Sequence, residues 1–177
     1  MRLVLLVLLA EYLALALFAL LGYIYHGAVP PWFINMLRDR LHEVVTGPLA
    51  IFGHNAIIMT ADSIPFVGPL ALAVTLGATG FVLGAVVGYA ASQLGPLALA
   101  VGYLATVAMP HGILELSSYA FATAGSIDAT RRLLSRRGGV LKTWLVHYAV
   151  ALALLLAAAY VEWWELETIG PILSRLG

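Results

Sequence analysis

The sequence predicts an all-α, polytopic membrane protein: one domain, residues 1–177, folded as a bundle of about five spanning helices. Three observations support this prediction. Hydrophobic residues make up 62% of the chain and charged residues only 10%, whereas a soluble domain carries about 25% charged residues. Several apolar runs approach the roughly 20 residues that a helix needs to cross a bilayer. The net charge is zero and cysteine is absent, which argues against nucleic-acid binding and excludes disulfides and thiolate chemistry.

The elements follow from the apolar runs. We expect spans at residues 3–24, 47–64, 69–91, 97–125 and 143–161. The first run is longer than the apolar core of a signal peptide and lacks a small-residue cleavage site, so we expect it to be retained. The second run is short and polar in places, so it either crosses the membrane or forms a re-entrant segment. Residues 31–45 predict a short amphipathic helix in the interface, anchored by Trp32.

The third expected span carries Gly80, Gly84 and Gly88, each separated from the next by four residues. Small residues at this spacing let helix backbones approach closely in a lipid environment. The pattern therefore predicts a packing face, whose partner helix belongs either to the same chain or to a second copy. Besides the lipid bilayer, we expect a homo-oligomer or other membrane proteins as partners.

Basic residues predict the orientation. The loop 126–142 holds five basic residues, and with Arg2 these are six of the nine in the chain. Short loops rich in Lys and Arg stay in the cytoplasm. With five spans, we therefore expect a cytoplasmic N-terminus, a cytoplasmic loop 126–142 and a C-terminus outside the cell membrane. If residues 47–64 are re-entrant, the N-terminus moves outside and the loop stays inside.

Ionisable residues lie deep within the apolar runs. An ionisable side chain at the bilayer centre costs roughly 2.5–3.5 kcal/mol, so it is retained where it has a partner or a function. His111 and Glu115 are four residues apart, which places them on one side of a helix. Similar depths along the other runs extend this polar cluster to Glu11, His54, Asn55 and Asp62.

Three interpretations of the cluster remain open. The polar groups could form interhelical hydrogen bonds that fix the bundle, with His111 paired to Glu115 or Glu11. His54, His111 and Glu115 could bind a divalent metal such as zinc, because imidazole and carboxylate are typical zinc ligands. The groups could also line a proton or ion path. The spacing His-x-x-x-Glu differs from the His-Glu-x-x-His pattern of zinc proteases.

The segments around these residues also resemble a known family. The run Pro110-His111-Gly112-Ile113-Leu114-Glu115, preceded by Ile51-Phe52-Gly53-His54-Asn55 and Ile64-Pro65-Phe66-Val67-Gly68, is similar to the stage II sporulation protein M (SpoIIM) family. The similarity covers residues 49–125, with His54 where the family usually has asparagine. The resemblance implies an integral membrane protein of about five helices. In spore formers the sporulation member works in a complex with peptidoglycan-degrading partners, but the family also occurs in organisms that do not sporulate, so we do not transfer that role.

The function expected first is that of a membrane scaffold or organiser, which needs no catalysis. The first alternative is an intramembrane metal-dependent hydrolase, with Glu115 as metal ligand or as the catalytic general base. The second alternative is a small transporter or channel. Whether the protein is an enzyme stays open at this stage.

Overall fold

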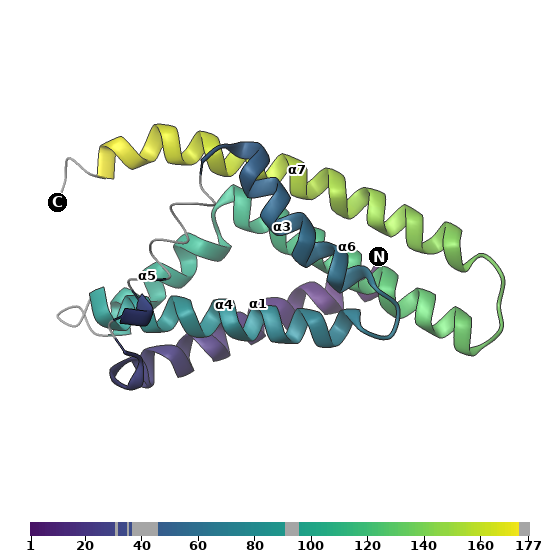
Figure 1. The fold of residues 1–177 in the computed structure, drawn as a ribbon, viewed down its shortest axis with the longest axis horizontal. Helices are drawn as coiled ribbons and strands as arrows, with labels where there is room; N and C mark the ends of the chain where they lie inside the picture. The colour runs from purple at the N-terminus through teal and green to yellow at the C-terminus, as the bar shows by residue number, and fades with distance from the viewer. Residues whose placement is uncertain (31, 35, 37–45, 91–95, 174–177) are drawn as a thin grey trace.

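A computed structural model describes residues 1–177 except 31, 35, 37–45, 91–95 and 174–177 (Figure 1). The described part of the chain contains helices and no strand, which confirms the all-α prediction. The helices are α1 (Arg2–Ile24), η1 (His26–Ala28), α3 (Pro48–Ser63), α4 (Gly68–Ala90), α5 (Pro96–Val107), α6 (Pro110–Leu134) and α7 (Val140–Leu173). The interfacial helix expected at 31–45 lies largely outside the described residues.

Two helix pairs form the body of the molecule. α1 and α4 lie side by side, and α6 and α7 form a long hairpin (Figure 1). α3 packs against α7, α6 and α4, and so connects the two pairs. The core lies around α6, which contacts α1, α3, α4 and α7, and it includes Val7, Met59 and Tyr119.

Among the described residues, three helices are long and apolar enough to cross a membrane: α1, α4 and α7 over Val140–Thr168. The pair α5 and α6 adds a fourth if the two helices together form one broken span. α3 has 16 residues, about 24 Å of helix, against a hydrocarbon thickness of about 30 Å. The structure therefore supports three or four spans by length and composition, and the expected crossing at 47–64 stays a prediction.

The prediction of one continuous helix over residues 97–125 is wrong. α5 ends at Val107, α6 begins at Pro110, and the two helices are bent by 67°. Proline has no N–H to donate and clashes with the carbonyl group four residues earlier, so it begins a helix more easily than it continues one. Met109 before it is extended, with φ −66° and ψ 148°, as expected for a residue preceding proline.

The loop expected at 126–142 is also shorter than predicted. α6 continues to Leu134 and α7 already begins at Val140. Tertiary contacts hold the polar end of α6 in the bundle: Ser126 Oγ donates a hydrogen bond to the carbonyl of Ile64 at 2.7 Å, and Ala129 is fully buried. At its other end, α7 extends beyond the expected boundary at residue 161.

The glycine face of α4 packs against α1 of the same chain. A Cβ atom added to Gly84 would lie 1.9 Å from the carbonyl oxygen of Ala19, and one added to Gly80 would lie 2.9 Å from that of Leu15. These distances leave no room for a side chain, so the backbones are in close contact. The predicted packing role of the glycines is confirmed, and the partner helix is identified as α1.

Candidate functional site

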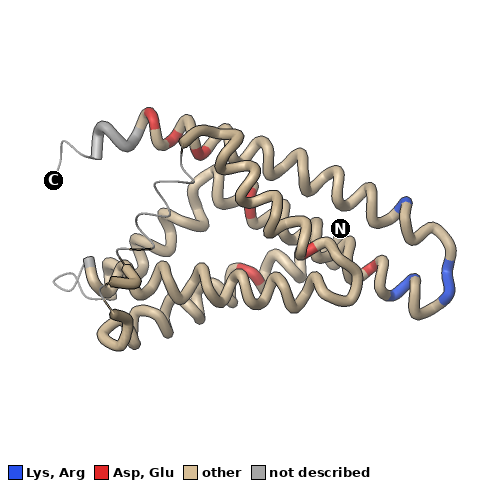
Figure 2. The backbone as a smooth tube through the Cα atoms, viewed as in Figure 1, with Lys and Arg blue, Asp and Glu red and all other residues tan. Residues whose placement is uncertain are grey.

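A row of polar side chains follows one face of α6. His111, Glu115, Tyr119 and Thr123 are each four residues apart, so they form a continuous ridge along the helix. Ser126 and Thr130 extend the row toward the end of the helix. Figure 2 shows that acidic positions are spread through the body of the molecule, whereas the basic positions gather where α6 joins α7.

At the first turn of α6, His111 pairs with Glu165 of α7. His111 Nδ1 and Glu165 Oε2 are in hydrogen-bond contact, and the two side chains are 19% and 7% exposed. Glu162, one turn earlier on α7, is close enough to interact electrostatically with His111 and Glu115. The pairing of His111 with Glu115 or Glu11, considered from sequence, is therefore replaced by an interhelical pair with Glu165.

One turn further along α6, Glu115 is bound by its own helix. The hydroxyl group of Tyr119 donates a hydrogen bond to Glu115 Oε1 at 2.7 Å. His111 and His54 are both near enough to Glu115 to interact with it electrostatically, although His54 is exposed and Asn55 is partly buried on α3. The structure thus brings Glu115, His111 and His54 into one region without joining the three by hydrogen bonds.

The centre of the bundle contains two carboxyl groups. Glu11 of α1 and Asp62 of α3 are both 0% exposed, and they lie within electrostatic range of each other. Among the described residues, none of their four carboxylate oxygens has a hydrogen-bond partner. Tyr119 is within electrostatic range of both, so this pair lies next to the α6 row. The hydroxyl of Thr123, one turn further along α6, is also buried without a partner.

Beyond this centre, the row of α6 holds the turn between α3 and α4. Ser126 Oγ binds the carbonyl group of Ile64, and the hydroxyl of Thr130 accepts a hydrogen bond from the backbone N–H of Phe66 at 2.7 Å. Phe66 has a φ of +68°, a backbone conformation that non-glycine residues rarely adopt. These hydrogen bonds therefore have a structural role.

A metal centre needs several ligand side chains that converge on one point. Within the described ranges, no group of three or more His, Asp or Glu side chains could hold a metal ion. The assignment of His54, His111 and Glu115 as metal ligands, with Glu115 as catalytic base, stays a prediction from the sequence.

The fold and this polar interior define a helical bundle with apolar helices compatible with a membrane protein. No family model, curated protein or solved structure matches the chain. The resemblance to the SpoIIM family accordingly remains a proposal.

Sequence reasoning missed Glu165, Glu162 and the role of Tyr119. The expected span ends at residue 161, before both glutamates. Their spacing of three residues places them on one face of a continuing helix, and this was the available signal. Tyr119 was detectable as the next member of the four-residue spacing after His111 and Glu115.

Proposed function

We propose that this protein conducts protons across a membrane, along the polar row of α6 and the buried carboxyl pair beside it. This proposal takes up the transporter or channel alternative. The observation that carries it is the pair Glu11 and Asp62, two fully buried carboxyl groups without a hydrogen-bond partner in the part of the chain that the structure describes. Ionisable residues inside membrane helices are expensive and commonly form ion pathways or proton relays.

The chemistry of the pair favours a proton over a metal ion. Two charged carboxylates close together in an apolar interior repel each other strongly, so a cation must accompany them. Calcium takes six to eight oxygen ligands, and magnesium takes six. No third acidic or histidine side chain in the described residues completes such a site with Glu11 and Asp62. A proton needs only one oxygen to bind and a second to accept it.

The neighbouring groups supply a route toward the α5–α6 break. Tyr119 lies within electrostatic range of Asp62 and Glu11, and its hydroxyl is bonded to Glu115. Glu115 interacts in turn with Glu162 and His111, and His111 is paired with Glu165. Each of these side chains can bind and release a proton, and water molecules could bridge the polar gaps between them.

The scaffold and hydrolase functions stay as predictions. A scaffold accounts for polar groups that are paired, such as His111 with Glu165, but not for unpartnered carboxyl groups at the centre of the bundle. A hydrolase requires a metal site with an open position for water. The buried carboxyl groups of Glu11 and Asp62 therefore favour proton conduction over these two functions.

Proton flux into liposomes tests the proposal. The purified protein is reconstituted with a pH-sensitive dye inside the vesicles, and a potassium gradient with valinomycin drives proton entry. We expect the protein to accelerate acidification, and Glu11→Gln and Asp62→Asn to return the rate to that of empty liposomes. The matched controls are Glu167→Gln, at an exposed position of α7, and Asp128→Asn, beside Arg131 near the end of α6; both should conduct normally.

Two results contradict this function. One is acidification at the rate of empty liposomes by folded wild-type protein. The other is an unchanged rate in both Glu11→Gln and Asp62→Asn, which would assign the flux to another part of the molecule.

A further inference from the structure

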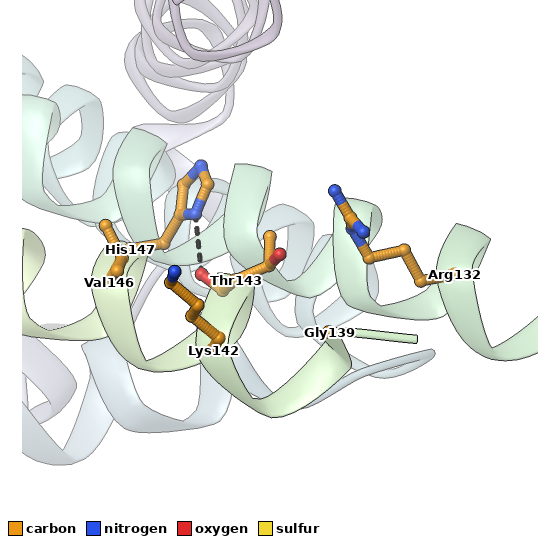
Figure 3. A pocket seen from close by; sticks show the side chains of 6 residues that line it. All are labelled: Arg132, Gly139, Lys142, Thr143, Val146 and His147. Carbon is orange, nitrogen blue, oxygen red and sulfur yellow. Dashed lines mark hydrogen bonds between the residues drawn. The ribbon is translucent and has the colours of Figure 1, made fainter. Parts of the chain in front are cut away.

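A pocket lies where the end of α6 faces the first turns of α7, and neither Glu11 nor Asp62 lines it. Its volume is about 410 Å³. Figure 3 shows the residues that line it: Arg132, Gly139, Lys142, Thr143, Val146 and His147. None of the six is acidic, and two are permanently cationic, so the pocket offers an anion a favourable electrostatic environment.

Several hydrogen-bond donors remain free at this pocket. Arg132 donates one N–H to the carbonyl of Gly138 at 3.1 Å, which orients the guanidinium and leaves its other N–H groups available. His147 Nδ1 donates to the carbonyl of Thr143 at 2.9 Å, so Nε2 faces a ligand as an acceptor in the neutral ring and as a donor in the protonated ring. The helical hydrogen bonds of α7 begin with the bond that Thr143 N–H donates to the carbonyl of Gly139, so the N–H groups before Thr143 are not bonded within the helix. These groups form the positive end of the helix dipole.

Exposed apolar side chains lie at the same ends of α6 and α7, and one of them, Val146, lines the pocket. Leu134 at the end of α6 is 72% exposed, and on α7 Leu141 and Val146 are 67% and 55% exposed. α7 is one of the helices long enough to cross a membrane, and the pocket lies at its first turns. A charged hollow at the end of such a helix, lined in part by Val146, matches a lipid that has an anionic head and apolar tails.

A second hollow increases the positive charge at this end of the molecule. It has a volume of about 210 Å³, and it is lined by Asp128, Arg131, Arg132, Ser135 and Arg137. Arg132, in the last turn of α6, lines both hollows, whereas Arg136, in the connection after α6, lines neither. This difference separates a built site from the general positive charge of the loop.

We propose that the pocket between α6 and α7 binds the phosphate headgroup of an anionic phospholipid, with Arg132 and Lys142 as charge partners and Thr143 as a hydroxyl donor. The place of the pocket at the first turns of a candidate membrane span, with exposed Val146 in its lining, favours a lipid over a soluble phosphate, because only a lipid has acyl chains to cover apolar side chains. The inference is independent of proton conduction.

Lipid titration of the purified protein tests the site. Phosphatidylglycerol and phosphatidylcholine are added separately to the protein in a neutral detergent, and bound lipid is counted by native mass spectrometry. We expect phosphatidylglycerol to bind in preference to phosphatidylcholine. Arg132→Gln and Lys142→Gln should each weaken its binding about fivefold, the effect of one basic residue at an anionic membrane surface.

Arg136→Gln is the matched control, because it removes the same charge from the connection between α6 and α7, outside the pocket. It should leave the affinity unchanged. Thr143→Val keeps the side-chain shape and both cations, so a weaker affinity in this variant supports the site even if Arg132→Gln fails to fold.

Three outcomes overturn the proposal. Equal binding of the two lipids removes the preference for an anionic headgroup. An equal loss in Arg136→Gln assigns the binding to diffuse loop charge. Complete displacement of phosphatidylglycerol by inorganic phosphate in the same titration shows that the pocket takes free phosphate.

Discussion

Glu11 stands out on the buried face of α1. The other buried residues of that helix are Val4, Val7, Leu15, Ala19 and Gly22. A carboxyl group in this apolar row, without a hydrogen-bond partner, lowers the stability of the fold. Proteins often retain such a cost at a functional site. The same reasoning applies to Asp62, which lies opposite it on α3.

This cost predicts that Glu11→Met stabilises the protein. Methionine has a similar length and no polar group, so the free energy of unfolding should rise by about 1–3 kcal/mol, the cost of an unsatisfied buried polar group. The measurement is denaturation in mixed micelles. Leu15→Ala, on the same buried face, should instead lower stability by about 2–5 kcal/mol. If Glu11→Met is as destabilising as Leu15→Ala, the carboxyl group makes contacts that the fold requires.

The His111–Glu165 pair should show energetic coupling. A double-mutant cycle with His111→Gln and Glu165→Gln is expected to give an interaction energy of about 0.5–3 kcal/mol, because the two side chains are in contact. The cycle of His111→Gln with Glu167→Gln serves as control, since Glu167 is exposed. In this control cycle, the changes in unfolding free energy of the two substitutions should add within about 0.5 kcal/mol. Additive effects in both cycles would remove the pair from the proposed route.

Among the elements, α1 and α4 depend on their glycine contact. Gly22 of α1 approaches α4 as closely as the α4 glycines approach α1: a Cβ atom there would lie 2.0 Å from the carbonyl oxygen of Phe81. The contact is thus built from small residues on both helices. Such packing relies on dispersion between closely spaced backbones, which is available inside a membrane where the hydrophobic effect between helices is absent.

Gly84→Ala should therefore be destabilising. Its new Cβ would lie 1.9 Å from a backbone oxygen of Ala19, so the helices must separate, at a cost of about 1–3 kcal/mol. Gly53→Ala is the matched control, because a Cβ at Gly53 has no atom within 4 Å. It should raise stability by about 0.5–1 kcal/mol through the higher helix propensity of alanine. Thermal melting of both variants in detergent compares them directly, and equal melting temperatures would contradict the packing.

Across the whole molecule, charge is distributed asymmetrically. The basic residues around the α6–α7 connection lie at one end of the helix pair (Figure 2). The acidic residues Glu162 and Glu165 lie toward the other end of α7. If α7 crosses the membrane, the positive-inside rule places the connection in the cytoplasm and the end of α7 outside.

Cysteine labelling tests this orientation, because the natural chain has no cysteine. We expect an impermeant thiol reagent to label Glu167→Cys in intact cells, and to label Arg137→Cys only after the cells are opened. Labelling of both positions from outside would show that α7 does not cross the membrane. The reverse pattern would invert the topology.

The sequence by itself determined the helices and much of their chemistry. Apolar runs of helical length define α1 and α4 because hydrophobicity is a local property of the chain. The spacing of Gly80, Gly84 and Gly88 showed a packing face for the same reason, although not its partner. Pro110 indicates the break between α5 and α6, because the missing N–H and the fixed φ of proline act locally. The prediction of a single helix did not take this effect into account.

Only the tertiary structure decided which polar groups meet. Glu11 and Asp62 are separated by 51 residues, and His111 and Glu165 by 54. Their proximity depends on how α1, α3, α6 and α7 pack, and side-chain type alone carries no information on that arrangement. Packing also kept α6 helical to Leu134, because the bonds from Ser126 and Thr130 to the α3–α4 turn hold a polar segment that the sequence pattern indicated as a loop.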